Sequence, residues 1–410
     1  MYYIKSFIDF LSAPTISFTL LTVAFPFIFP PTDWFETKNK KWGIYNLWTN
    51  KGGFWIFLSI TLFFVIGYFD PYFNLTMTKP DNIPIILMIY SMIFVIWLGM
   101  KKSYINDARI ERGEKPEEWA DPDDKVLVWP DLVYIELIAL IIFMVLLIVW
   151  SILIGAPLEE PANPAATPNP SKAPWYFLGL QEMLVYFDPW IAGIIFPIFI
   201  IVGMMAIPYM DINKKGEGYY SFKERRVGYF VFMYGWVVLW VFLIVIGTFF
   251  RGPNWNFFGP FEWWDPHKVV PLTNINLSEY IWIKLLNTGL PSNILQREAV
   301  GILVVIGYMF VMPLLLAKTK LKHVYEYYGP VRYTTMMLFG LTMFALPIKM
   351  YLRFSKSTGM ITIVFVHCLP MPLSEKLKCT PSRPYDIAKI PHSRYASVGM
   401  TPNFYGIKET

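Results

Sequence analysis

Residues 132–155 read LVYIELIALIIFMVLLIVWSILIG, and Glu136 is the one charged residue among them. An α-helix of this length crosses the ~30 Å hydrocarbon core of a bilayer, and lipid requires a helix because backbone groups there must be satisfied internally. Seven apolar runs have this character: Gly53 to Phe69, Ile83 to Met100, Leu132 to Gly155, Ile191 to Met210, Val227 to Phe250, Ala299 to Ala317 and Tyr333 to Ile348. The sequence therefore predicts an all-α, polytopic helical membrane protein with about seven transmembrane helices.

The composition of the chain excludes a soluble globular protein. Of its 410 residues, 55% are hydrophobic and 16% are charged, with 34 Phe, 25 Tyr and 16 Trp. These values depart far from those of soluble domains. The net charge of +5 is modest, so we expect no nucleic-acid partner.

Basic residues alternate between the connecting loops. Four connections are rich in them, and these hold Lys38, Lys40, Lys41 and Lys51; Lys101, Lys102, Arg109, Arg112, Lys115 and Lys125; Lys214, Lys215, Lys223, Arg225 and Arg226; and Lys318, Lys320, Lys322 and Arg332. Two intervening loops hold only Lys79 and Lys172. By the positive-inside rule, the rich loops face the cytoplasmic or matrix side, and the Lys172 loop faces the opposite, positive side of a bacterial cytoplasmic or organellar inner membrane. The basic tail after Arg353 does not follow this pattern.

Two further apolar stretches are too short to cross a membrane. Residues Ile16 to Phe29 span 14 positions, and because a span needs about 20 residues we expect an interfacial or re-entrant helix rather than a signal peptide. Residues Met360 to Leu369 are expected at the interface. The resulting organisation is an N-terminal interfacial segment (1–52), a two-helix segment with a basic loop (53–128), a three-helix domain (129–250), an aromatic positive-side excursion (251–297), two C-terminal helices (298–352) and a tail (353–410).

The histidines and cysteines do not form a recognisable metal or heme site. His267, His323, His367 and His392 lie at or beyond the predicted helix ends, and no two share one helix face as bis-histidine heme ligation requires. Cys368 and Cys379 have neither a Cys-x-x-Cys nor a heme-attachment spacing. We therefore expect no metal and no heme on this chain.

The stretch from Pro161 to Phe177 carries the most specific pattern. It reads Pro-Ala-Asn-Pro-Ala-Ala-Thr-Pro-Asn-Pro-Ser-Lys-Ala-Pro-Trp-Tyr-Phe. It resembles the loop of subunit IV of cytochrome bf complexes, and of the C-terminal part of cytochrome b in cytochrome bc complexes, where a Pro-Ala-Asp-Pro-x-Ala-Thr-Pro run precedes a Pro-Glu-Trp-Tyr motif with the same spacing. The resemblance covers roughly residues 129 to 250, including Trp129-Pro130-Asp131 before it and Ala206 to Asp211 after it.

The resemblance implies a site for quinol oxidation on the positive side of the membrane. Its residues would be Pro174, Trp175, Tyr176 and Phe177, with aromatic rings for the slot and the Tyr176 phenol as a hydrogen-bonding group. An anchoring role at the headgroups is the alternative for these aromatic residues. Pro174 replaces the family's glutamate, which places the usual proton exit in doubt.

Three acidic residues are candidates for proton transfer. Glu182 lies seven residues after Trp175, on the same face of a helix, and it is either the substitute proton acceptor or a structural partner. The resemblance places an acid for proton uptake at a negative-side quinone site near Asp131 and Glu136. Acids beside a membrane helix are functional candidates, although Glu136 lies near enough to the helix end to snorkel.

The resemblance also implies the partners. The b-type hemes and the iron–sulfur cluster would be held by a heme-bearing cytochrome b subunit and a Rieske iron–sulfur protein, with a cytochrome c-type acceptor. The complex would be dimeric, and this chain alone would catalyse nothing. The leading hypothesis is a heme-free subunit of a quinol oxidoreductase that uses a quinone as substrate. A quinone-binding anchor of another dehydrogenase or reductase is the alternative. A transporter is disfavoured, because the span centres hold few polar residues and the chain shows no repeat.

Overall fold

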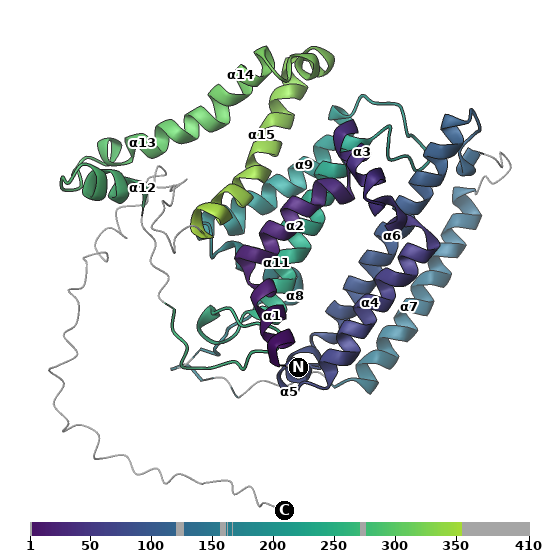
Figure 1. The fold of residues 1–410 in the computed structure, drawn as a ribbon, viewed down its shortest axis with the longest axis horizontal. Helices are drawn as coiled ribbons and strands as arrows, with labels where there is room; N and C mark the ends of the chain where they lie inside the picture. The colour runs from purple at the N-terminus through teal and green to yellow at the C-terminus, as the bar shows by residue number, and fades with distance from the viewer. Residues whose placement is uncertain are drawn as a thin grey trace, which may run out of the picture. The chain divides into compact units, whose positions relative to one another are not determined.

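A computed structural model describes residues 2–119, 127–155, 161, 163–165, 167–270 and 276–354 of the chain (Figure 1). These residues form helices joined by turns and loops, with one isolated antiparallel bridge between Arg251 and Phe257. The predicted all-helical class is confirmed. The expected interfacial run Met360 to Leu369, both cysteines, His367, His392 and the tail from residue 355 onward lie outside the described residues.

Seven helical segments are long and apolar enough to cross a membrane, which confirms an integral membrane protein. They are Asn50–Tyr68 (α4), Ile83–Glu111 (α6), Val128–Leu153 (with α7, Val133–Leu153), Ile191–Met210 (with α9, Phe196–Met210), Arg226–Phe250 (with α10, Arg226–Met233, and α11, Phe242–Val245), Ile294–Lys318 (with α13, Ile294–Ile306, and α14, Met312–Lys318) and Lys322–Arg353 within α15 (Lys322–Phe354). Each contains or overlaps one of the predicted runs. Three shorter helices precede the first span: α1 (Tyr2–Ser12), α2 (Pro14–Ile28) and α3 (Asp33–Lys41). Others lie between spans: α5 (Pro71–Met77), α8 (Trp175–Met183) and α12 (Leu277–Glu279).

A break interrupts the helix that contains the last span. Gly329 in α15 has a φ of 76°, which glycine adopts readily, and Pro330 follows it. Both residues interrupt regular helix geometry, because proline lacks the N–H that a helix interior uses. The predicted run from Tyr333 accordingly starts just after the break.

The first two spans form an antiparallel pair. The hydroxyls of Thr61 in α4 and Tyr90 in α6 lie 3.1 Å apart, and Phe57 contacts Phe94 with ring centroids 6.3 Å apart. Near the start of α4, a Cβ on Gly53 would meet the Trp97 ring at 2.5 Å. The absence of a side chain at Gly53 therefore leaves room for the Trp97 ring of α6.

The N-terminal helices α1 and α2 meet at a bend of 71°. Lys5 in α1 pairs with Asp70, which follows the first span, at 2.5 Å. Beyond α2, Asp33 and Glu36 of α3 pair with Arg226 at the start of the fifth span, each at 2.6 Å. Asp70 and Arg226 lie at opposite ends of the spans. Helices α1 and α2 therefore run together from one end of the bundle to the other.

Helix α2 runs beside the fifth span. Phe25 contacts Tyr234 with ring centroids 5.4 Å apart, and Phe18 contacts Phe242 at 5.7 Å. Phe18 and Phe25 are buried, so apolar burial holds α2 within the bundle. Helices α1 and α2 therefore have the geometry of a broken span or of a re-entrant loop, and the second of these is one of the two alternatives predicted for Ile16 to Phe29.

The end of the bundle that carries the basic loops is fixed by a buried carboxylate. Asp107 in α6 accepts hydrogen bonds from the Ser221 hydroxyl at 2.6 Å and from the backbone N–H groups of Phe222 and Lys223 at 3.2 and 3.0 Å. The side-chain amide of Asn106 donates to the Tyr220 carbonyl at 2.9 Å. These bonds attach the loop before the fifth span to the end of the second.

At the opposite end, apolar packing attaches α5 and the start of α6 to the fifth span. Phe73, Met77 and Ile85 form a buried cluster with Phe249. The Phe73 ring also stacks on Phe261 at 5.3 Å. The turn between the first two spans is thereby held against the excursion that follows the fifth span.

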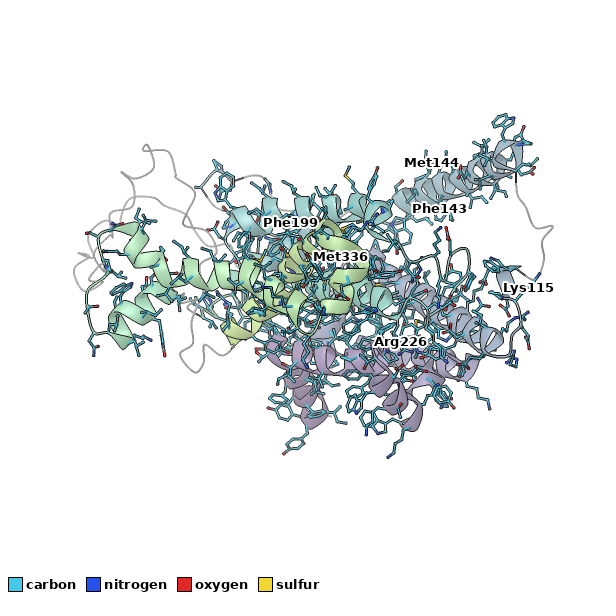
Figure 2. All side chains as sticks on the ribbon, turned by 90° about the horizontal axis from the view of Figure 1, so that it is seen from above. Lys115, Phe143, Met144, Phe199, Arg226 and Met336 are labelled. Carbon is cyan, nitrogen blue, oxygen red and sulfur yellow. The ribbon has the colours of Figure 1, made fainter. Side chains whose placement is uncertain are left out.

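Helix α7 is exposed along its length. Its residues from Val133 to Val149 are all exposed, although the span has the highest mean hydropathy of the seven, 3.1. Figure 2 shows Phe143 and Met144 on a helix that stands away from the other labelled residues. This apolar surface is available to lipid or to another polypeptide.

Candidate functional site

The loop before α8 is held in place from two sides. The Gln181 side chain accepts a hydrogen bond from the Ala173 N–H at 2.9 Å and donates one to the Ser171 carbonyl at 2.8 Å. On the other side, the Asn169 side chain exchanges two hydrogen bonds with Asn254, at 2.6 and 2.9 Å. The residues between these anchors are therefore positioned by both α8 and the excursion.

Helix α8 packs closely against the end of the fifth span. A Cβ on Gly247 would lie 3.2 Å from the Leu178 carbonyl oxygen, and a Cβ on Gly179 would lie 3.3 Å from a side-chain carbon of Ile244. Both distances are shorter than ordinary van der Waals contacts. The two glycines thus allow α8 to lie directly on the span.

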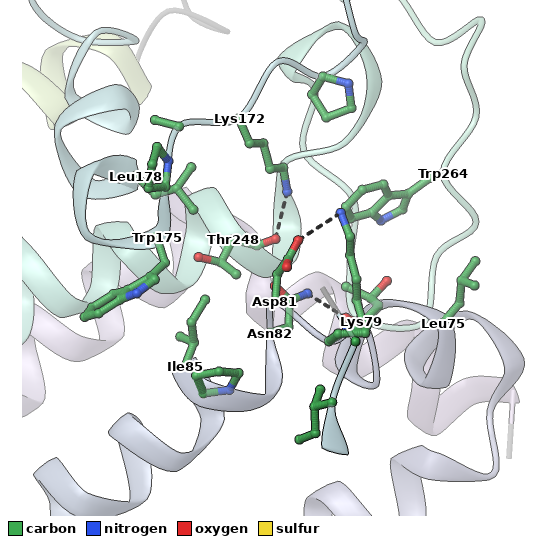
Figure 3. A pocket seen from close by; sticks show the side chains of 18 of the residues that line it. Leu75, Lys79, Asp81, Asn82, Ile85, Lys172, Trp175, Leu178, Thr248 and Trp264 are labelled. Carbon is green, nitrogen blue, oxygen red and sulfur yellow. Dashed lines mark hydrogen bonds and ion pairs between the residues drawn. The ribbon is translucent and has the colours of Figure 1, made fainter. Parts of the chain in front are cut away.

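A cavity of about 930 Å³ opens at this place. Its size falls in the range of small-molecule sites, ~300–1,000 Å³. Five parts of the chain contribute to its wall, which Figure 3 shows from close by. The lining residues are Tyr72, Leu75, Thr76, Lys79, Pro80, Asp81, Asn82, Pro84 and Ile85; Trp150, Ser151, Ile154 and Gly155; Pro170, Lys172, Ala173, Pro174, Trp175 and Leu178; Thr248; and Glu262, Trp263 and Trp264.

Lys172 is the most deeply placed cation of this wall. Its ammonium nitrogen donates to the Thr248 carbonyl at 2.8 Å and lies 4.9 Å from the centre of the Trp264 ring (Figure 3). Burial is the main cause that lowers the pKa of Lys172 from its ordinary 10.5 to about 7. The positive charges of Lys79 and Arg251 contribute to this lowering, and the negative charge of Glu182 partly opposes it. The amine is therefore poised to gain or lose a proton near neutral pH.

Thr248 contributes a buried hydroxyl to the same wall. Its side chain is buried, and within the described part of the chain Oγ1 has no hydrogen-bond partner. An unsatisfied buried hydroxyl costs free energy, so such a group in a cavity wall marks a place where a ligand oxygen would be stabilised.

Pro174 and Trp175 line the cavity, whereas the other two predicted quinol-site residues do not. Tyr176 and Phe177 are outside its wall, with exposed fractions of 48% and 50%. Their rings contact each other at 4.6 Å. The turn of α8 separates the four residues, because consecutive helical positions point about 100° apart.

Glu182 is buried behind the cavity and does not line it. Its carboxylate accepts two hydrogen bonds from Arg251, at 2.8 Å from Nε and 2.5 Å from Nη2. A carboxylate held in this way matches the structural alternative stated for Glu182. The structure does not bring it together with Trp175 in one site.

Asp131 and Glu136 lie at the other end of the bundle. Both are exposed, and neither lines the cavity. The two described histidines, His267 and His323, are also exposed and lie at opposite ends of the spans. Such a pair does not fit the two axial positions of one b-type heme.

The site contains residues that the sequence pattern did not identify. Lys79, Asp81 and Ile85 come from the turn between the first two spans, and Trp264 comes from the excursion. The tryptophans of the excursion and the isolated Lys172 stand out in the sequence. That they line the same cavity depends on packing between segments far apart in the chain. These segments, which the family resemblance does not explain, therefore complete the wall.

A comparison with protein families identifies the central part of the chain. Residues 161–261 match the family model described as cytochrome b(C-terminal)/b6/petD, and no solved structure matches the chain. The match includes the loop, α8, the fourth and fifth spans and the start of the excursion, and so it includes Lys172, Pro174, Trp175 and Thr248. It confirms the resemblance drawn from the Pro161 to Phe177 pattern. Residues 161–261 thus form a cytochrome b C-terminal segment within an integral membrane protein of seven candidate spans.

Proposed function

We propose that this chain is a heme-free subunit of a Rieske/cytochrome b-type quinol oxidoreductase and that its cavity is the quinol oxidation site. The observation that carries the proposal is the position of Pro174 and Trp175 in the wall of a cavity within the family-matched segment. The acceptor is a cytochrome c or a similar protein.

The shape of the cavity suits a quinol. Trp175 and Trp264 offer aromatic faces to a ring, while Lys172, Thr248 and Asp81 offer polar groups for its oxygens. Residues Trp150 to Gly155 end the exposed third span and form another part of the wall. A substrate dissolved in lipid would therefore meet the cavity beside a lipid-accessible helix.

The other redox components are assigned to partner subunits. A heme-bearing cytochrome b subunit would take one electron, and a Rieske iron–sulfur protein would pass the other towards the acceptor. The residues of this chain bind and orient the quinol, exclude water from its ring and receive its protons. The exposed apolar surface of α7 suits a membrane partner.

Orientation follows from the charge distribution. The loops rich in Lys and Arg adjoin the end that carries Asp107 and Arg226, and the cavity lies at the opposite end. The positive-inside rule then supports a cavity on the periplasmic or intermembrane side. Protons released from it would add to the proton gradient.

The proposal is tested with the native complex in mild detergent. We expect it to contain b-type heme and an iron–sulfur protein, and to reduce a cytochrome c-type acceptor when quinol is added. A complex with quinone but without an iron–sulfur partner would instead support the alternative, a quinone-binding anchor of another dehydrogenase or reductase.

A further inference from the structure

Pro174 cannot accept a proton, and the buried carboxylate of Glu182 is held by Arg251 outside the cavity. A quinol bound beside Trp175 would still need a base within hydrogen-bonding distance. Among the residues of the described wall, Lys172 and Thr248 are neighbours in space, since Lys172 Nζ lies 2.8 Å from the Thr248 carbonyl oxygen.

We propose that Lys172 accepts the first proton of the bound quinol and that the Thr248 hydroxyl binds the same quinol oxygen. This inference rests on the proposed function, because it assigns roles within that cavity. It names a base for a site that lacks the glutamate at position 174.

The geometry around Lys172 supports this role. Its Nζ donates to the Thr248 carbonyl, which leaves the lone pair of the neutral amine available to a hydroxyl. Trp264 lies on one side at 4.9 Å from Nζ, and Pro170, Ala173 and Pro174 border the same cavity. The amine is thus held by one hydrogen bond and one aromatic ring while it faces the cavity.

The Thr248 hydroxyl supplies an independent observation. Oγ1 is buried, and no partner satisfies it among the described residues, although the Thr248 side chain lines the cavity. A quinol oxygen there would complete its hydrogen bonding. Because the carbonyl of the same residue binds Lys172, one ligand oxygen can meet both side chains.

The proton moves from the quinol oxygen to Lys172. The quinol O–H bond breaks, the proton bonds to Nζ, and both bonding electrons remain on the oxygen. The anion then gives one electron to the one-electron acceptor that the proposed function assigns to the iron–sulfur partner. The ammonium group returns its proton to water, and the base is restored.

Several charged groups set the titration of Lys172. Lys79 faces it from the turn before α6, Arg251 from the end of the fifth span and Glu182 from α8, while Asp81 and Glu262 border the cavity. Burial and the two cations keep its pKa at about 7, so the neutral base predominates above that pH. Turnover should therefore rise with pH through about 7 and then level off.

The test uses the purified complex with Lys172→Met, Lys172→Arg and Thr248→Val, and with Lys284→Met and Thr342→Val as matched controls outside the cavity. We expect Lys172→Met to lower turnover about 100-fold, the lower range for a general base, and to remove the rise near pH 7. Lys172→Arg should do the same because a guanidinium stays protonated. Thr248→Val should raise KM about tenfold, equivalent to one lost hydrogen bond, and keep the pH profile.

The results distinguish failure of the proposed function from failure of the role assigned to Lys172. If the wild-type complex oxidises no quinol, the proposed function fails. If it does and either assembled Lys172 variant keeps the wild-type rate and pH profile, the role of Lys172 is refuted. Should Lys172→Met not assemble, Lys172→Arg, which still donates a hydrogen bond, carries the test.

A measurement on the wild-type complex adds a second test. An amine-reactive reagent at pH 8 should modify Lys172, and a quinone analogue should protect it, whereas Lys284 should be modified equally with and without the analogue. Modification of Lys172 that the analogue does not reduce would overturn the inference.

Discussion

Arg251 holds Glu182 with two parallel hydrogen bonds, 2.8 Å from Nε and 2.5 Å from Nη2, and both side chains are buried. Burial disfavours the charge on Arg251, but the Glu182 carboxylate outweighs it and raises the pKa of Arg251. Nη1 also donates to the Trp255 carbonyl at 3.1 Å. The pair therefore joins α8 to the excursion, the two segments that form opposite parts of the cavity wall.

The pair predicts the effect of Glu182→Gln. Removal of one partner leaves a buried guanidinium without its counter-charge, which costs about 3–5 kcal/mol in comparable pairs. We expect a lower thermal midpoint of the purified complex and less assembled complex. The rise of turnover with pH should be kept but should move to lower pH, because the Glu182 charge raises the pKa of Lys172. The double variant Glu182→Leu with Arg251→Met removes both charges and should recover part of the lost stability.

This experiment also tests Glu182 as the proton acceptor. In that case Glu182→Gln would slow quinol oxidation about 100-fold and remove the rise of turnover with pH, while the thermal midpoint stayed near that of wild type. That result would assign to Glu182 the role that we assign to Lys172.

Trp175→Ala should impair quinol oxidation directly. The ring lines the cavity, and its removal takes away both apolar contact and an aromatic face. We expect KM to rise or turnover to fall by about tenfold or more, corresponding to at least ~1.4 kcal/mol. Trp55→Ala, on the exposed face of α4, is the matched control, and equal losses in both variants would contradict a specific role for Trp175.

Tyr176→Ala distinguishes two interpretations of the aromatic run. If the cavity wall alone binds the quinol, its effect should be smaller than that of Trp175→Ala, because Tyr176 is outside the wall. Steady-state kinetics of the two variants in parallel would decide. A larger loss in Tyr176→Ala would indicate that its phenol reaches the quinol after a rearrangement of α8.

The lowered pKa of Lys172 predicts how stability depends on pH. Between about pH 7 and its ordinary value of 10.5, the unfolded chain binds a proton at this residue that the folded chain does not. Stability therefore rises with pH across that range. The thermal midpoint should increase more between pH 7 and pH 9 in the wild-type complex than in Lys172→Met, and an equal increase would argue against a lowered pKa.

The broken N-terminal span predicts a topology that cysteine labelling can test. After replacement of Cys368 and Cys379, we expect Tyr3→Cys and Ala165→Cys to react with an impermeant reagent from the positive side, and Lys41→Cys from the other side. All three positions are exposed. Reaction of Tyr3→Cys and Lys41→Cys from one side would restore an interfacial segment.

The spans were predictable because each depends on local composition. Residues Leu132 to Gly155 contain one charged residue, and this property of a single segment is sufficient to identify a span. The bent pair of α1 and α2 was not predictable in the same way. Its course depends on the pairing of Lys5 with Asp70 and of Arg226 with Glu36, which join residues 65 and 190 positions apart in the chain.

The candidate site was predictable only in part for the same reason. Pro174 and Trp175 stood out because the loop has a recognisable spacing. The contribution of Thr248 depends on a helix end that looks uniformly apolar in the sequence, and Lys79 belongs to a segment with no family resemblance. The role of Lys172 emerges only when burial and neighbouring charges are known.

Photoaffinity labelling tests the central claim most directly. The purified complex is irradiated with an azido-quinone, and the labelled peptides are identified by mass spectrometry with and without excess unlabelled quinol. The cavity predicts labels within residues 72–85, 150–155, 170–178 and 248–264 that excess quinol suppresses. Suppressible labels confined to other segments, in a complex that oxidises quinol, would show that the reaction occurs elsewhere.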